Sequence, residues 1–380
     1  MAKLKLGMVG GGQGAFIGGV HRIASRIDNH YELVAGSLAS NPEIANVSAK
    51  ELGINDDRSY ATFQDMAEKE SLREDGIDVV AIVTPNFLHY PIAEAFLSKN
   101  IHVICDKPLT HNLDDAEKFL ESVKKSKALF ALTHNYTGYP MVRQAREMFR
   151  NGEIGNLRVI QVEYAQDWLT LPIENEGQKQ ASWRTDPSKA GMGGSIGDIG
   201  SHAFNLVDFI TGAKLNELCA DISSFVPGRK NDDNAHVLLR YENNVKGMLW
   251  SSQVAPGNEN ALRIRIYGDK GGMEWEQENP NYLTVDIFGK AKKIIRRAGN
   301  ETIDIGNRIT RIPPGHPEGY LEGFANIYSD FAKQILAFKD NQKPEKDILL
   351  VPSIEDGVKG VKFITTVVES GSNGGKWIKF

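Results

Sequence analysis

The stretch "VGGGQGAFIGGVHR", from Val9 to Arg22, contains six glycines and decides how the first part of the chain is interpreted. An apolar run, "LKLGMV" (4–9), precedes this loop and predicts a strand, and the helical spacing of apolar residues in "VHRIASRI" (20–27) predicts a helix after it. A glycine-rich loop between a strand and a helix is a place where open α/β sheets bind nucleotides.

The glycines have the spacing of a dinucleotide-binding fingerprint, Gly10-x-Gly12-x-x-Ala15. In that fingerprint the first glycine permits a tight turn, the second lets the backbone approach a pyrophosphate, and a small third residue allows close packing of helix and strand. No Lys-Ser or Lys-Thr pair follows, which excludes a P-loop. We therefore favour nucleotide binding over a plain strand–helix turn, and expect cofactor contacts from Gly10, Gly12, Gln13, Gly14 and Ala15.

The predicted second strand, "YELVAGSL" (31–38), lacks the acidic residue that usually holds the adenosine ribose of NAD. Ser37, Ser40 and Asn41 stand in that region, and Glu32 comes too early in the strand. No carboxylate there repels a 2′-phosphate, and no arginine beside it would bind one. NAD and NADP therefore both stay open as the cofactor, with Ser37 and Ser40 as expected contacts.

Strands and helices continue to alternate along the chain. "IDVVAIVTP" (77–85) and "IHVICDKP" (101–108) are continuous apolar runs typical of strands covered on both faces, and "HYPIAEAFLSKN" between them has helical spacing. This alternation predicts a doubly wound parallel sheet that extends to about "ALFALTHNY" (128–136).

The pattern changes after about residue 135. Three longer segments, "LRVIQVEYAQDW" (157–168), "AHVLLRYENNVKGMLW" (235–250) and "ALRIRIYGDKGGMEW" (261–275), are joined by turn residues and predict a large, mainly antiparallel sheet with one apolar face. Two amphipathic helices follow near the end of the chain. We expect an α/β protein with a Rossmann domain over residues 1–134 and a second α/β domain over 135–380, with C-terminal helices that could pack back on the first.

The composition argues against several classes of function. The 380 residues are 41% hydrophobic and 24% charged, the net charge is −5, and no basic block suited to nucleic acid occurs. The longest apolar stretches are far shorter than a membrane span, and the first residues do not resemble a secretion signal. Cys105 and Cys219 are too few for a disulfide framework or a thiolate zinc site. A cytoplasmic protein that needs no metal is the expectation.

A second glycine-rich segment, "GMGGSIGDIGSHAFNLVDFI" (191–210), leads into a helix on which Asp198 and His202 are four residues apart and share a face. Such a pair alone is commonly a surface ion pair. Lys107, in "CDKP", could likewise be a solvated charge, but it follows a strand at the sheet edge where ligands bind, and Pro108 makes its turn rigid. Together the three side chains suit alcohol oxidation: the histidine accepts the hydroxyl proton, the aspartate fixes its tautomer, and the lysine stabilises the developing alkoxide.

In order and spacing, "GGGQGA", "TPNFLH" (84–89), "HVICDKP" and "GGSIGDIGSHAFNLVD" resemble the motifs of the glucose-fructose oxidoreductase/inositol dehydrogenase/rhizopine catabolism (Gfo/Idh/MocA) oxidoreductases. The resemblance covers nearly the whole chain. It implies catalytic roles for Lys107, Asp198 and His202, and a second domain that binds substrate and whose open sheet forms homodimers or homotetramers. It also implies cofactor contacts from Thr84, Pro85, Asn86, His89, Asp106, Lys107 and Asn135.

Two features depart from the family pattern. The loop is a few residues longer than usual before His21, which leaves the roles of Gly14, Gly18 and Gly19 open. Asp106 replaces the commoner glutamate before the lysine, a change that we expect to be tolerated.

The family acts on sugars, cyclic polyols and their derivatives, so the resemblance implies a substrate of this class. Residues 161–187 are polar and include indoles that could stack on a sugar ring, although each could equally pin a loop. No arginine cluster suited to a carboxylate is evident, which favours a neutral ligand. Besides Lys107, Asp198 and His202, we expect substrate contacts from Tyr136, Trp168, Trp183, Arg184 and His316.

These observations predict an NAD(P)-dependent dehydrogenase that oxidises a ring secondary alcohol of a sugar, glycoside or inositol to a ketone, or catalyses the reverse reduction. The alternative is a glycoside hydrolase or lyase that keeps NAD bound and oxidises its substrate transiently, for which the same residues would serve. A non-catalytic cofactor sensor is a third reading, and the intact set Lys107, Asp198 and His202 argues against it.

Overall fold

The computed structural model describes residues 3–380, which form two compact units. The first unit combines the chain up to Gly138 with Tyr320–Val358, and the second combines Tyr139–Gly319 with Lys359–Phe380. Part of the C-terminal region therefore belongs to the first unit. The domain boundary between residues 134 and 135 stays a prediction.

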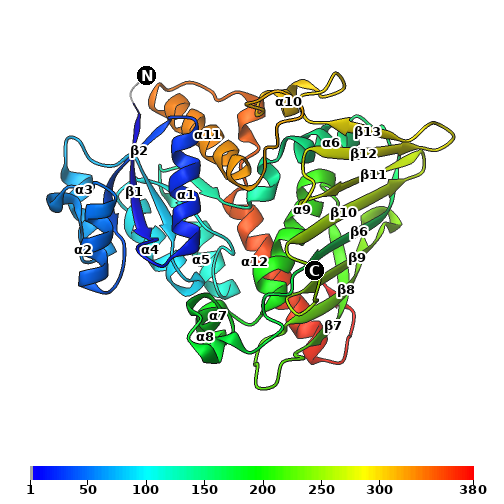
Figure 1. The fold of residues 1–380 in the computed structure, drawn as a ribbon, viewed down its shortest axis with the longest axis horizontal. Helices are drawn as coiled ribbons and strands as arrows, with labels where there is room; N and C mark the ends of the chain where they lie inside the picture. Colours follow the sequence, from blue (N-terminus) through cyan, green and yellow to red (C-terminus); the bar gives the residue numbers. More distant parts are fainter. Residues whose placement is uncertain (1–2) are drawn as a thin grey trace. The chain divides into compact units, whose positions relative to one another are not determined.

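The first unit contains the blue and cyan segments of Figure 1. It is built on a five-stranded sheet in the order β2-β1-β3-β4-β5. All of its neighbouring strands are parallel, which confirms the doubly wound sheet predicted from the sequence. The strands are β1 (Leu4–Gly10), β2 (Tyr31–Ser37), β3 (Val79–Val83), β4 (His102–Cys105) and β5 (Phe130–Leu132).

Helices cover both faces of this sheet. Leu6 and Met8 of β1 belong to a buried apolar cluster that includes Phe324 and Phe331 of α11, a helix that also packs on α1. On the opposite face, a side chain added at Gly7 would meet Met66 of α3, and α3 packs on α4. The helices of this unit are α1 (Phe16–Ile27), α2 (Pro42–Glu51), α3 (Phe63–Leu72), α4 (His89–Leu97), α5 (Leu113–Lys125) and α11 (Tyr320–Lys339).

The second unit is built on a nine-stranded sheet in the order β13-β12-β11-β10-β6-β9-β8-β7-β14. Neighbouring strands are antiparallel except β6 and β9, which are parallel, so the predicted mainly antiparallel sheet is confirmed. The strands are β6 (Leu157–Ala165), β7 (Leu215–Ser223), β8 (Asn234–Tyr241), β9 (Lys246–Ser252), β10 (Ala261–Gly268), β11 (Gly271–Glu276), β12 (Tyr282–Ile287), β13 (Lys293–Arg296) and β14 (Ile378–Lys379).

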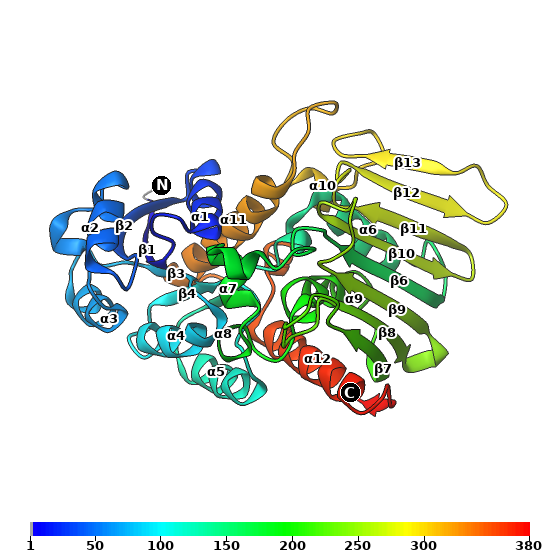
Figure 2. The same cartoon turned by 60° about the horizontal axis from the view of Figure 1, so that its bottom comes forward.

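Only one face of the nine-stranded sheet is covered by helices. Leu262, Ile264 and Ile266 of β10 point to the face on which α6 and α9 pack, whereas Arg263 and Arg265 point to the other, as their alternation predicted. Among residues 3–380 no helix covers that second face; Figure 2 shows the strands of this sheet side by side, from β13 to β7. The remaining helices are α6 (Pro140–Arg150), α7 (Lys179–Arg184), α8 (Pro187–Ala190), α9 (Ser201–Thr211), α10 (Asp304–Asn307) and α12 (Ile354–Ser372).

Candidate active site

The glycine-rich loop connects β1 to α1 and depends on glycine at several positions. Gly10 has a φ of +81°, and a side chain there would lie 2.9 Å from Cγ2 of Thr84 at the end of β3. A Cβ on Gly18 would lie 2.4 Å from Cα of Gly11. Close packing was expected at Ala15, but the close approach of α1 occurs at Gly18, against Gly11 of the loop, because α1 begins only after the longer loop and Ala15 is its N-cap residue.

The loop is tied to the region that follows β2. The Gly12 N–H donates to the Leu38 carbonyl at 3.0 Å, and the Gln13 N–H donates to the Ser48 hydroxyl of α2 at 2.9 Å. Ser37 is buried at the end of β2, and Ser40 is exposed in the short connection to α2. The loop and the serine-rich segment are therefore neighbours.

Two features of this edge fit a bound dinucleotide. Gly14 has a φ of +74°, and a Cβ there would meet nothing within 4 Å, so the loop faces open space. The hydroxyl oxygen of Thr84 is buried and has no hydrogen-bond partner among the residues that the structure describes. A loop with exposed backbone, next to a buried hydroxyl oxygen that has no hydrogen-bond partner among the described residues, suits a ligand rich in phosphate and hydroxyl oxygens.

Lys107 follows β4 and is anchored through its neighbour Asp106. The Asp106 carboxylate accepts hydrogen bonds from the Lys107 N–H and the Thr133 hydroxyl, both at 2.9 Å. Burial raises the pKa of Asp106, but His21, Lys107 and His89 together lower it to about 2, so the group is an anion at neutral pH.

The buried ring of His89 joins two of the predicted cofactor segments. Its Nε2 lies 2.8 Å from the Thr84 carbonyl oxygen, and its Nδ1 lies 2.9 Å from that of Pro108. Burial lowers the pKa of His89 from its ordinary value. Asn86, in the short turn before α4, is also buried, as are Asn135 and Tyr136 in the 3₁₀ turn after β5, while Pro85 is half-buried.

Asp198 lies in a π-helical turn, Ile196–Gly200, and not in the α-helix that the spacing predicted. Helix α9 begins at the next residue and carries His202, which is 7% exposed and lies beside the ring of Tyr164. Gly200 allows the wide turn to lie against β9, since a Cβ there would be 3.2 Å from the Ser251 hydroxyl.

The Asp198 carboxylate has two donors from distant parts of the second unit. Arg184 Nε lies 3.2 Å and Gln253 Nε2 lies 2.9 Å from Asp198 Oδ2. The Arg184 guanidinium also stacks 4.2 Å from the ring of Trp183. The structure thus brings one predicted substrate residue, Arg184, to the predicted catalytic carboxylate, with Trp183 stacked on it. It adds Gln253, which the sequence analysis missed.

The sequence analysis also missed Asp232, which holds the glycine turn before Asp198. This buried carboxylate accepts hydrogen bonds from the Gly194 N–H at 2.6 Å, the Ser195 hydroxyl at 2.8 Å and the Ile196 N–H at 2.9 Å. Burial raises its pKa above the ordinary value, while these hydrogen bonds oppose the rise. The consecutive acids in "NDDN" (231–234), just before a strand, were the available signal.

The remaining substrate candidates have less defined surroundings. Trp168 follows β6 and is half-buried, and His316 is exposed in the loop 311–319. The His316 carbonyl accepts a hydrogen bond from Arg297, a buried cation paired with Glu318. This ion pair fixes the backbone of the loop and leaves the imidazole at the surface.

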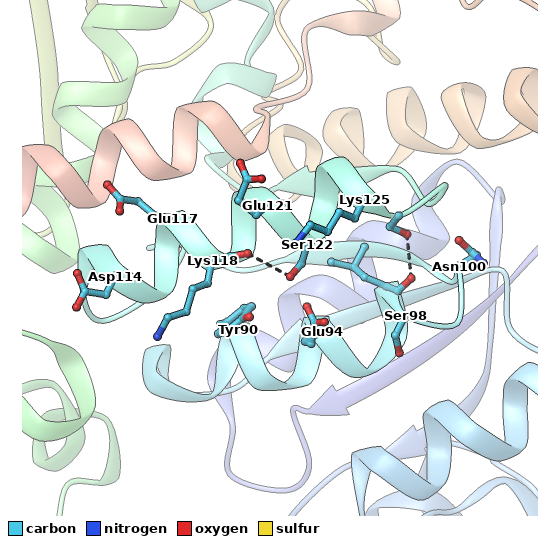
Figure 3. A pocket seen from close by; sticks show the side chains of 12 residues that line it. Tyr90, Glu94, Ser98, Asn100, Asp114, Glu117, Lys118, Glu121, Ser122 and Lys125 are labelled. Carbon is cyan, nitrogen blue, oxygen red and sulfur yellow. Dashed lines mark hydrogen bonds between the residues drawn. The ribbon is translucent and has the colours of Figure 1, made fainter.

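A groove of about 820 Å³ lies in the first unit between α4 and α5 (Figure 3). Its lining is polar and includes Tyr90, Glu94, Glu117, Lys118 and Glu121. None of the predicted site residues lines it. We therefore do not assign the chemistry to this groove.

Two consecutive segments of the chain match known family models. Residues 4–148 match the oxidoreductase family with an NAD-binding Rossmann fold, and residues 142–274 match the GFO/IDH/MocA C-terminal domain. An oxidoreductase from Sinorhizobium meliloti is 52% identical, with all of both chains covered and a TM-score of 0.91. The chain belongs to the Gfo/Idh/MocA oxidoreductase family. It is an NAD(P)-dependent oxidoreductase, as the motifs predicted.

Two further relatives have more specific names. An inositol dehydrogenase homologue from Azotobacter vinelandii, solved with NAD⁺, is 33% identical over 100% of this chain and 97% of its own, with a TM-score of 0.94. Levoglucosan dehydrogenase from Pseudarthrobacter phenanthrenivorans is 27% identical, over 84% of this chain and 83% of its own.

Two kinds of feature are absent from residues 3–380. No helix there has the length and apolar character needed to cross a membrane. Within the same residues, no group of three or more His, Cys, Asp or Glu side chains could hold a metal ion.

Proposed function

We propose that this oxidoreductase converts a ring secondary alcohol of a neutral sugar, glycoside or cyclic polyol to a ketone, and catalyses the reverse reduction. The observation that carries the proposal is the arrangement in the second unit, where Arg184 and Gln253 hold the Asp198 carboxylate four residues before the buried His202. A fixed carboxylate near a shielded histidine suits proton transfer from a hydroxyl group.

Each side chain has a distinct part in the proposed reaction. A bound nicotinamide supplies the acceptor for the hydride. A ring nitrogen of His202 takes the hydroxyl proton, and Asp198 stabilises the resulting imidazolium or holds a neighbouring hydroxyl group. The Lys107 ammonium donates to the same oxygen and stabilises negative charge that develops on it. Trp168 and Trp183 offer indole surfaces for the ring of the substrate.

The named relatives support the substrate class. The A. vinelandii homologue has also been solved with NADH and myo-inositol, and levoglucosan dehydrogenase is named for an anhydrosugar. Both compounds are neutral rings that carry several secondary hydroxyl groups. The argument from charge points the same way, because Arg184 is already paired with Asp198 and is not aimed at a substrate carboxylate.

The first experiment follows the absorbance of reduced nicotinamide after the protein is mixed with NAD or NADP and a panel of inositols, free sugars and glycosides. A rise with one cofactor and one compound class is the expected result. Consumption of a glycoside with no net reduction, and with cofactor found tightly bound, would instead indicate the internal-redox hydrolase or lyase.

The Lys107→Ala variant tests the role of the lysine. We expect turnover to be abolished while the dissociation constant of the cofactor, measured by calorimetry, stays near that of the wild type, because the ammonium is needed for the reacting oxygen. Lys118→Ala, at an exposed lysine of α5, is the control and keeps full turnover. Loss of cofactor binding in Lys107→Ala would assign that lysine a different role.

We also infer that the protein is a homodimer or homotetramer formed through the uncovered face of the nine-stranded sheet. Leu238 and Met248 are paired across β8 and β9 on this face and are 53% and 43% exposed. Beside them, Arg263 pairs with Glu274, and Arg265 lies 3.6 Å from Glu163. Apolar side chains flanked by charges of both signs suit a second copy of the same surface.

The free thiols of Cys105 and Cys219 support a cytoplasmic location.

A further inference from the structure

Asp106 is approached by a pair of buried side chains from helices far apart in sequence, His21 and, behind it, Tyr328. His21 of α1 is fully buried, and its Nδ1 lies 2.8 Å from the hydroxyl oxygen of Tyr328 of α11. Its Nε2 points toward Asp106, 3.9 Å from Oδ1. The same Oδ1 accepts the N–H of Lys107, so His21 and Lys107 meet at one carboxylate oxygen.

The location of the protons in this cluster follows from its chemistry. Burial, and then the charge of Asp106, raise the pKa of Tyr328 well above its ordinary value, so the phenol keeps its proton. The phenol can therefore donate to His21 Nδ1, which leaves the ring proton on Nε2. The opposite tautomer would turn a lone pair of Nε2 toward the Asp106 anion, which is repulsive.

The Nε2 atom of His21 is unusual for a buried polar atom. It has no hydrogen-bond partner among the described residues, because 3.9 Å is too long for a hydrogen bond to Asp106. Leaving such a group unsatisfied in the interior carries a free-energy cost. A simple packing role would be met more favourably by an apolar side chain, since the neighbouring Phe324 ring lies 5.1 Å away.

We propose that His21 and Tyr328 are positioning residues for Lys107. These two side chains act by holding the Asp106 carboxylate against the Lys107 backbone. Tyr328 fixes the ring of His21, and the ring presents its Nε2 proton to Asp106. Asp106 in turn fixes the backbone N–H of Lys107. The proposal rests on the function proposed above for Lys107. It gives a role to a histidine that the cofactor fingerprint does not explain.

A measurement without substrate tests the first step. In protein labelled with ¹⁵N-histidine, long-range proton–nitrogen spectra distinguish the two ring nitrogens, and the His21 signals are those lost in His21→Gln. We expect Nε2 to carry a proton, and the His21 signals to shift in Asp106→Asn. A neutral ring protonated only at Nδ1 would overturn the proposal, because that ring cannot donate toward Asp106.

Kinetics test the second step. His21→Leu and Tyr328→Phe are expected to lower kcat at least about tenfold while the cofactor dissociation constant changes less than about twofold, because a misplaced reacting group costs rate. His21→Gln, whose amide can place a donor near the Nε2 position, should recover part of kcat. His30→Leu is the matched control, since His30 contacts Ser329 of the same helix α11 at 3.1 Å.

A double-mutant cycle separates positioning from stability. If His21 acts through Asp106, His21→Leu lowers kcat by less than about twofold when Asp106→Asn is already present. An equal loss in both backgrounds, or an equal loss in His30→Leu, would overturn the proposal. Full turnover in Lys107→Ala would refute the proposed role of the lysine, whereas the histidine spectra would still report whether His21 donates toward Asp106.

Discussion

His102 of β4 is a buried ring whose hydrogen bond fixes its protonation state. Its Nδ1 accepts a hydrogen bond from the Leu129 N–H at 2.8 Å, and a nitrogen that accepts cannot carry a proton. Burial lowers the pKa of His102 to about 4. The charge of Asp78 opposes this lowering of the pKa, and the charge of Lys339 adds to it. The ring is therefore neutral in the folded protein at pH values where the unfolded chain is protonated.

This difference makes stability depend on pH in a defined direction. The ordinary pKa of the ring is 6.5, so as pH falls from 6.5 toward 4 the unfolded chain binds the proton first, and the free energy of unfolding decreases. The contribution of His102 to this decrease is about 3 kcal/mol over the whole interval. We expect chemical denaturation at several pH values to show a flatter profile for His102→Asn, whose amide oxygen can still accept from Leu129.

The control is His316→Asn, at an exposed histidine, which should leave the pH profile of the wild type unchanged. A profile as steep for His102→Asn as for the wild type would contradict the assignment.

At the scale of elements, the contact between α1 and the glycine-rich loop is set by the absence of two side chains. Gly18 of the helix and Gly11 of the loop approach so closely that a Cβ on Gly18 would lie 2.4 Å from the Gly11 Cα and 2.8 Å from its carbonyl oxygen. These are backbone atoms, which cannot rotate away. The next residue, Gly19, is free of this constraint, with Arg22 Nη2 as the nearest atom at 3.9 Å.

Alanine at these two neighbouring positions should therefore have opposite effects. Gly18→Ala is expected to lower the free energy of unfolding by about 2 kcal/mol, through overpacking, and to weaken cofactor binding about tenfold because the loop must move. Gly19→Ala is expected to raise stability by up to about 1 kcal/mol, since alanine favours helix, with cofactor binding unchanged. Thermal unfolding and calorimetric titration measure both effects, and equal stability of the two variants would refute the close contact.

Helices and strands could be predicted where a short, continuous stretch of sequence carries the pattern that specifies them. The strands β1, β3 and β4 are continuous apolar runs and were found, and β10 was found from strict alternation. Helix α2 was missed although Asn41 caps it by accepting from the Ile44 N–H and Pro42 opens it, a signal that the sequence does contain.

The site was predictable where motifs are contiguous and not where partners are distant. Lys107, Asp198 and His202 were singled out because each lies in a short, recognisable segment, and their catalytic roles stay predictions. Gln253 is 55 residues from the carboxylate it binds, and Asp232 is 36 residues from Ile196, so neither contact leaves a local pattern. The π-helical turn at Asp198 is only five residues long, which is too short for its sequence periodicity to distinguish it from an α-helix.

At the scale of the whole molecule, the uncovered sheet face makes the state of association testable. Leu238→Lys combined with Met248→Lys places two ammonium groups on the proposed interface, and desolvating them opposes association. We expect light scattering after size exclusion to give a mass near 42.0 kDa for this variant and a multiple of it for the wild type.

Leu72→Lys is the matched control, because this leucine of α3 is 77% exposed and lies in the other unit. It should retain the mass of the wild type. A wild-type protein that elutes as a single chain would refute the interface.

The membership of α11 in the first unit has a consequence for biosynthesis. Phe324, Tyr328 and Phe331 belong to the same apolar cluster as Leu6 of β1, yet the ribosome makes them only after the whole sheet of the second unit except β14. A nascent chain therefore carries the first five parallel strands with one face incompletely covered for most of its elongation. Translation pauses and chaperone contacts before residue 339 would act on that exposed surface, and the Rossmann half completes its core only as translation nears its end.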